Sequence, residues 1–216
     1  MPRNPQIRER FDRIDGATAD GSRYSSPYAS LLADLFPSRE GYRVTPERAF
    51  ESTDQPVVFV VTRAGHPVLF VDIKPPLNTR DVGSRAAADR AMRERFARLV
   101  GRLEIPRLYG LSAMGPRFAV YVYTAATGVL DPELEAMAKR SRLDIGDEVA
   151  PARRWEYDLR EGRGEGKVGE IVGEVKEMCG RVAGEREKGP DEAVVVVGRR
   201  LQRVVRAMTG GGSQGG

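Results

Sequence analysis

Residues 55–74 read QPVVFVVTRAGHPVLFVDIK, and this stretch decides the fold of the chain. Gln55–Thr62 and His66–Lys74 are both rich in β-branched and aromatic residues, which favour buried strands. Arg63-Ala64-Gly65 between them is typical of a tight turn, and Pro75-Pro76 ends the second strand. The sequence therefore predicts a β-hairpin at this point of the chain.

The end of the second strand carries an acid and a base on one face. Side chains alternate along a strand, so Asp72 and Lys74 point the same way as Phe70. Burying either charge unpaired would cost several kcal/mol, so we expect the two to pair, to bind a ligand or to lie at the rim of the sheet. A simple salt bridge between them is the alternative to a functional site.

In one possible register of the hairpin, the carboxylate of Asp54 lies next to Asp72 and Lys74. A turn centred on Ala64 pairs Val57 with Val71 and Asp54 with Lys74. Opposite residues of an antiparallel pair share a face, with Cβ atoms roughly 5 Å apart, so Asp54 then joins the acid–base pair. A slip of one residue turns Asp54 to the opposite face, and this interpretation therefore depends on the register.

Two carboxylates placed in this way suit a hard cation such as Mg²⁺ or Mn²⁺. Mg²⁺ prefers oxygen ligands and keeps several waters, and we expect Asp54, Asp72 and the backbone carbonyl of Ile73 to bind it. A bound ion polarises a phosphodiester and lowers the pKa of an attacking water. Lys74 beside the ion can orient that water or stabilise negative charge in the transition state.

The flanking sequence predicts helices and further strands around the hairpin. Apolar spacing and composition predict helices over Ser25–Leu35, Arg85–Leu103 and Glu170–Val182, and strands over Ile105–Ala113 and Arg117–Thr124. Gly41–Phe50 is either a strand or an irregular edge segment, because Pro46 weakens a strand. This order predicts an α/β fold with a central mixed β-sheet flanked by helices.

The rest of the chain is less regular. Glu133–Lys139 is a short helix at best, Gly162–Gly166 is expected to be a linker, and Trp155 is expected to pack on the core. Ala193–Met208 is either a helix or a strand followed by a helix. We expect a flexible N-terminal arm over residues 1–22, an α/β domain over 23–182, a C-terminal helical extension over 183–209 and a disordered glycine-rich tail over 210–216.

The positive charge of the chain is concentrated in one segment. Seven arginines and three acids lie between Arg80 and Arg102, a local balance of +4 that equals the net charge of the whole chain. We expect a basic helix whose Arg85, Arg90 and Arg93 contact the phosphates of a nucleic acid. The alternative is a solvated helix face without a partner.

Composition excludes several classes of protein. The chain has 216 residues with one Cys and one His, which excludes a disulfide framework and Cys-rich or His-rich metal sites. His66 lies roughly 20 Å along the strand from Asp72 and is not expected to be catalytic. The longest apolar runs are far shorter than a membrane helix, and no signal peptide is visible. We therefore expect an intracellular protein without a membrane partner; nucleus or cytoplasm, and the oligomeric state, are left open.

The order of these motifs resembles the PD-(D/E)XK nuclease superfamily. Asp54 and an apolar strand precede Val71-Asp72-Ile73-Lys74, and a helix beginning Arg85-Ala86-Ala87-Ala88-Asp89-Arg90 follows. The next strands, around Tyr109–Gly115 and Arg117–Tyr121, also match the pattern. More narrowly, Pro67–Pro76, Ala86–Phe96 and Tyr109–Gly115 resemble a group of uncharacterised fungal proteins of the basidiomycete type. The resemblance covers about residues 24–182.

This resemblance implies a restriction-endonuclease-like fold and Mg²⁺-dependent hydrolysis of the phosphodiester bonds of nucleic acid. It implies that Asp54 and Asp72 bind the metal and that Lys74 is the catalytic base or stabiliser. Two features depart from the family: Pro56 follows the first acid instead of preceding it, and Ser25–Leu35 carries no Glu. Because the superfamily also contains inactive members, the alternative is a catalytically inactive module that binds nucleic acid or protein.

Overall fold

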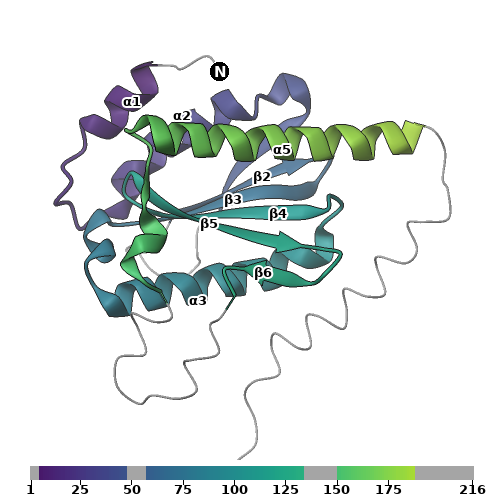
Figure 1. Cartoon of the computed structure of the whole chain (residues 1–216). Coiled ribbons are helices and arrows are strands. Elements are labelled where there is room, and N and C mark those ends of the chain that lie inside the picture. The colour runs from purple at the N-terminus through teal and green to yellow at the C-terminus, as the bar shows by residue number, and fades with distance from the viewer. Residues whose placement is uncertain (1–4, 48–56, 134–149, 188–216) are drawn as a thin grey trace, which may run out of the picture.

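A mixed seven-stranded β-sheet forms the centre of the computed structural model, which describes residues 5–47, 57–133 and 150–187 (Figure 1). The strands follow the chain across the sheet: β1 (Tyr42–Glu47), β2 (Val57–Arg63), β3 (His66–Lys74), β4 (Arg107–Met114), β5 (Arg117–Thr124) and β6 (Val129–Asp131). The short β7 (Tyr157–Asp158) also pairs with β5. Only the β3–β4 pair is parallel; the other described pairs are antiparallel.

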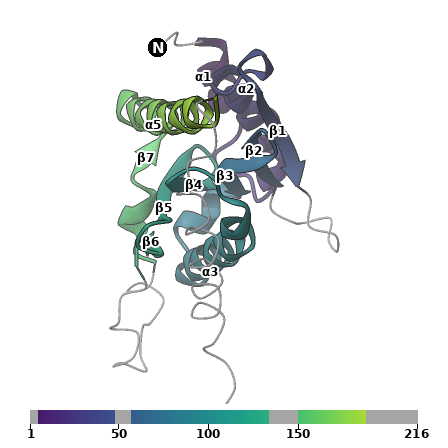
Figure 2. The same cartoon turned by 90° about the vertical axis from the view of Figure 1, so that its right-hand side faces the viewer.

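Helices cover both faces of this sheet. Within the described ranges they are α1 (Pro5–Asp12), α2 (Ser25–Leu35), α3 (Val82–Leu99) and α5 (Gly162–Glu187). α2 and α5 lie on one face and α3 on the other (Figures 1 and 2). Since α3 connects β3 to β4, it is the crossover that a parallel strand pair needs. The predicted α/β fold with a mixed sheet between helices is thus confirmed.

The alternation along β3 assigns its side chains to these two helical layers. Leu69 and Val71 face α2 and α5, where they line one apolar seam with residues of both helices. Phe70 faces α3, and its ring packs edge-on against Phe96 at a centroid distance of 4.8 Å. Both faces of β3 are therefore covered, which is why the strand is buried from Pro67 to Lys74.

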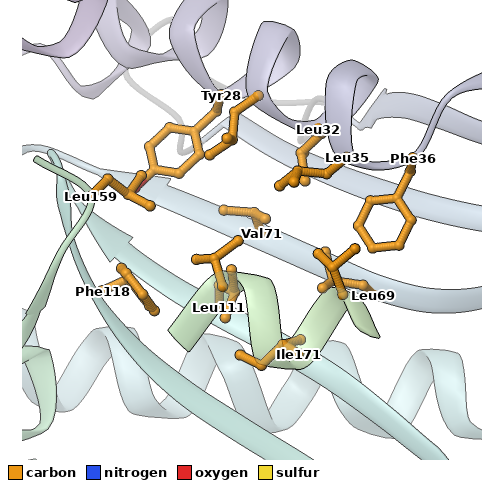
Figure 3. A pocket seen from close by; sticks show the side chains of 13 residues that line it. Tyr28, Leu32, Leu35, Phe36, Leu69, Val71, Leu111, Phe118, Leu159 and Ile171 are labelled. Atoms are coloured by element: carbon orange, nitrogen blue, oxygen red, sulfur yellow. The ribbon is translucent and has the colours of Figure 1, made fainter. Parts of the chain in front are cut away.

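The seam between α2, α5 and the sheet contains a small void (Figure 3). Its volume is about 10 Å³, no polar surface lines it, and its walls include Leu32, Val71, Leu111 and Ile171. A space of this size that offers a water no hydrogen-bond partner stays empty. The void is therefore a packing feature of the core and not a ligand site.

The β2–β3 register differs from the predicted one by two residues. Val57 pairs with Ile73 instead of Val71, and the register is irregular between Val61 and Thr62. The turn consists of Ala64 and Gly65, which both have positive φ, +50° and +86°, as a two-residue hairpin turn of this kind requires. Because the shift is an even number of residues, the residues from Val57 to Val61 keep the face that the alternation predicts.

One prediction about a segment outside the hairpin is wrong. Gly162–Gly166 is not a linker but the first turn of α5, which runs on to Glu187. The expected flexible arm contains α1, whose Phe11 is 2% exposed and packs edge-on against Tyr28. Burial of this ring fixes the helix to the domain.

The burial of Trp155, at 2% exposure, is confirmed. The predictions for Glu133–Lys139, for Ala193–Met208 and for the glycine-rich tail lie outside the described residues.

Candidate functional site

Asp72 and Lys74 lie side by side at the end of β3, on the face that α3 covers. Lys74 Nζ is 2.7 Å from Asp72 Oδ1 and donates a hydrogen bond to it. Asp72 is 2% exposed and Lys74 is 9% exposed, so the ion pair is almost entirely buried. The prediction that the two side chains share one face is confirmed, and the salt bridge that we gave as the alternative is formed.

Close backbone contacts fix this end of β3. The Gly115 amide donates to the Lys74 carbonyl at 2.9 Å, and Gly115 itself has a φ of +63° in the β4–β5 turn. On the other side, a Cβ at Gly21 would lie 2.9 Å from both the Lys74 carbonyl carbon and the Pro75 nitrogen. Glycines at these two positions therefore allow the chain to pack against the strand end that carries the ion pair.

Ser112 of β4 is the nearest polar residue across the ladder. It pairs with Asp72 in the parallel β3–β4 register, so the two side chains share the α3 face. Ser112 is completely buried, and within the described ranges its hydroxyl has no hydrogen-bond partner. The sequence analysis does not place Ser112 in the site, because its position next to Asp72 depends on the parallel pairing of β3 with β4.

Arg85 does not lie on an open basic surface. Its side chain is directed into the protein, the residue is 4% exposed, and its guanidinium donates to the carbonyls of Ala150 and Thr79 at 2.9 Å each. This corrects the expectation that Arg85 presents its charge to a phosphate. The physical reason is its position on the helix: Arg85, Ala88 and Met92 lie on the buried side of α3.

A buried carboxylate on α3, that of Asp89, binds Arg93. Asp89 is 2% exposed and accepts hydrogen bonds from Tyr121 Oη at 2.9 Å, Arg154 at 2.9 Å and Arg93 Nε at 2.8 Å. Burial, together with the neighbouring Asp89 charge, raises the pKa of Tyr121 above its ordinary value. Arg93 is therefore committed to a structural network between α3, β5 and the segment before β7, which limits the surface role that we expected of it.

The remaining arginines of this segment divide into bound and open side chains. Arg95 forms an ion pair with Glu47, and Arg102 donates to the Gly65 carbonyl. Arg80 and Arg90 are exposed, and neither has an ion-pair partner in the described part of the chain. Arg98 is exposed as well, and its Nε donates to the Glu94 carbonyl of the same helix. Of the expected set Arg85, Arg90 and Arg93, Arg90 is the exposed member.

His66 and Cys179 take no part in this site. His66 begins β3, at the opposite end from Asp72, and its Nε2 lies 2.9 Å from a Glu104 carboxylate oxygen. Cys179 is buried on the inner side of α5, and this burial raises the pKa of its thiol. His66 is therefore at the end of the strand that the sequence analysis expects, away from Asp72.

The structure describes two of the three expected metal ligands, Asp72 and Ile73. Asp72 lies as described, Ile73 is completely buried in the ladder between β2 and β4, and Asp54 lies outside the described residues. Across the described ranges, no three His, Cys, Asp or Glu side chains come together as a metal-binding group. The described part of the site therefore contributes a single carboxylate, that of Asp72, next to an ammonium and a hydroxyl.

No protein-family model, curated protein or solved structure matches this chain. Of the helices in the described ranges, none is both long and apolar enough to cross a membrane.

Proposed function

We propose that this chain is a nuclease-like protein of the PD-(D/E)XK superfamily that hydrolyses phosphodiester bonds of nucleic acid with Mg²⁺ or Mn²⁺. The observation that carries the proposal is the contact of Asp72 with Lys74 at 2.7 Å, at the end of the third strand. The order α2–β1–β2–β3–α3–β4, with β4 parallel to β3, agrees with the restriction-endonuclease-like fold that the sequence resemblance implies.

The donor chemistry at the strand end fits a hard cation. Mg²⁺ in proteins is commonly held by one or two carboxylates, several waters and the phosphate of the substrate. Among the described residues Lys74 is the one hydrogen-bond partner of Asp72, and it binds a single carboxylate oxygen, Oδ1. Asp72 would hold the ion, with Asp54 and the Ile73 carbonyl as the further ligands that we expect. When bound, the ion supplies Lewis acidity to the scissile phosphate and acidity to a water.

Lys74 has the position of a charge-stabilising group. Its ammonium is fixed by Asp72 and largely withdrawn from water, so its charge acts in surroundings of low dielectric constant. A donor held in advance next to a reacting phosphate stabilises the negative charge that develops in the transition state. Arg90, exposed on α3, is the residue that we propose to contact a flanking phosphate.

Cleavage of nucleic acid tests this proposal. The purified chain is expected to cleave plasmid or single-stranded DNA or RNA with Mg²⁺ or Mn²⁺ and not with EDTA, and Asp72→Asn is expected to abolish cleavage. Glu177→Gln, at an exposed carboxylate on α5, is the matched control and should cleave as the wild type does. Circular dichroism of each variant shows that it is folded. Cleavage by Asp72→Asn equal to that of the wild type would refute the assignment.

A catalytically inactive module that binds nucleic acid or protein is the second candidate, and the position of α2 favours it. That helix carries no Glu and lies on the face opposite Asp72, so it adds no carboxylate to the site. This candidate predicts binding of labelled DNA that weakens steeply with salt, without cleavage under any of the metal conditions. Absence of binding at low salt would argue against both nucleic-acid functions.

A further inference from the structure

The hydroxyl of Ser112 is a buried polar group that the architecture of the sheet does not use. Ser112 has no exposed surface, and its Oγ has no hydrogen-bond partner in the described part of the chain. A buried hydroxyl without a partner destabilises a protein, so each such group needs an explanation. An alanine would fill nearly the same space, and alanines indeed stand beside it at 113 and 119.

The position of this hydroxyl points to the candidate site. In the row of side chains that crosses β3, β4 and β5 at this level, Ser112 lies between Asp72 and Ala119, and the row faces α3. Asp72 is therefore the polar group on the neighbouring strand at the same level. Adjacent strands lie roughly 4.8 Å apart, so the hydroxyl and the carboxylate are near enough for one ion to bind both.

We propose that Ser112 Oγ is a second oxygen donor of the cation site at Asp72, a role that rests on the function proposed above. Lys74 binds Asp72 Oδ1 and is the carboxylate's one hydrogen-bond partner among the described residues. A carboxylate oxygen and a hydroxyl oxygen from adjacent strands form a pair of hard donors of the kind that Mg²⁺ and Mn²⁺ take. Ser112 contacts the ion or its water shell and positions it; it does not react with the substrate.

Binding of Mn²⁺ by isothermal titration calorimetry, without any nucleic acid, tests this role. The full chain is expected to bind Mn²⁺, Asp72→Asn to lose binding, and Ser112→Ala to bind at least tenfold more weakly, the range typical for supporting groups of metal sites. Ser26→Ala, an exposed serine on α2, is the matched control and should bind like the wild type. Equal affinities of the wild type and Ser112→Ala would overturn the inference while leaving the Asp72 site intact. A wild type that binds no Mn²⁺ would overturn the site itself.

Two further measurements separate a ligand role from a structural one. Ser112→Cys replaces a hard donor by a soft one, so it should bind Mn²⁺ more weakly and Cd²⁺ more tightly than the wild type does. Metal-free Ser112→Ala should unfold at a urea concentration no lower than the wild type, because the change removes a buried hydroxyl without a partner. A Ser112→Ala midpoint well below that of the wild type would show that the hydroxyl supports the fold, and would overturn the inference.

Discussion

Asp72 and Lys74 show how a single pair of residues limits what can be changed in this protein. Both side chains are almost entirely buried, and each is the partner that compensates the charge of the other. Transfer of an ion from water to a protein interior is costly, so such a pair adds little net stability while the loss of one member is severe. A change at either position is therefore expected to destabilise the fold, whether or not the site is catalytic.

Replacing one member of this pair should therefore cost more than replacing both. Lys74→Met leaves the Asp72 carboxylate buried without a counter-ion and is expected to lower the free energy of unfolding by about 3–5 kcal/mol. The double change Asp72→Leu with Lys74→Met should recover most of this loss. Urea unfolding of the three proteins measures both effects. A loss below about 1 kcal/mol in Lys74→Met would mean that solvent reaches Asp72 more freely than the structure shows.

Asp158 is the residue that links stability to acidic pH. Burial by itself would raise the pKa of Asp158, but hydrogen bonds from Arg160 and the charges of Arg160 and Arg117 outweigh it, so the pKa lies below its ordinary value of 3.8. Below that value the unfolded chain binds more protons than the folded one. The stability that the carboxylate contributes is therefore present above pH 3.8 and is lost as the pH falls through the folded-state pKa.

Asp158→Asn tests this linkage. The variant should be less stable than the wild type at pH 7, and the difference should shrink as the pH is lowered below 3.8. Urea midpoints measured from pH 7 down to pH 3 give the comparison, with Glu161→Gln, at an exposed carboxylate nearby, as the control. A difference that stays constant over this range would show that Asp158 acts through packing and not through its charge.

At the level of elements, α3 differs most from what its sequence suggests. Its arginines predict a basic surface, yet Arg85 and Arg93 are bound inside the protein, and Arg95 pairs with Glu47 of β1. Helical periodicity alone cannot reveal this, because several partners are distant in the sequence: Glu47 of β1 and the carbonyls of Pro132 and Ala150. Charge counted along a helix is a poor guide to surface potential when some of its positions face the sheet.

Two glycines of α5 lie in contrasting environments, and replacing each of them tests how this helix packs on the rest of the protein. A Cβ at Gly173 would meet no atom within 4 Å, whereas a Cβ at Gly164 would lie 2.0 Å from the Asp158 carbonyl oxygen. Gly173→Ala should therefore raise the free energy of unfolding by about 0.5–1 kcal/mol, because alanine loses less backbone entropy in a helix. Gly164→Ala should lower it. Thermal unfolding measures both, and destabilisation by Gly173→Ala would contradict an open outer face of α5.

On the scale of the whole molecule, the two faces of the sheet have different roles. The face under α2 and α5 packs through a largely apolar seam, in which the Tyr28 hydroxyl is bound to the Gly115 carbonyl (Figure 3). The face under α3 holds Asp72, Lys74, Ser112 and Asp89. Polar groups are costly to bury, so their concentration on this face is in keeping with the site that we propose there.

Binding of DNA by the whole molecule should depend on the accessible arginines and not on the total count. Arg90→Ala is expected to reduce the slope of log K against log salt concentration by about 0.9, the value for one phosphate contact. Arg39→Ala, an exposed arginine between α2 and β1, is the control and should leave the slope unchanged. Fluorescence anisotropy with a labelled duplex at several salt concentrations measures this. Equal slopes for the wild type and Arg90→Ala would remove Arg90 from the interface.

The local sequence determined where the hairpin strands and the following helix form, and that Asp72 and Lys74 share one face of their strand. Alternation in His66–Lys74, the turn at Ala64-Gly65 and the apolar spacing of the helix after β3 follow from short-range sterics and burial, so they can be predicted from neighbouring residues. The hairpin register was missed by two residues, because the details of the turn and the irregularity at Val61/Thr62 depend on packing.

Only the tertiary structure decided which charges are buried and which polar groups meet. The parallel β3–β4 pairing places Ser112 next to Asp72, and packing of α3 on the sheet turns Arg85 and Asp89 inward. These contacts join residues about 30 to 65 positions apart, and their energies depend on desolvation by the assembled core. A sequence pattern specifies which side chains share a face of one strand or helix, whereas only the packed sheet determines what lies opposite that face.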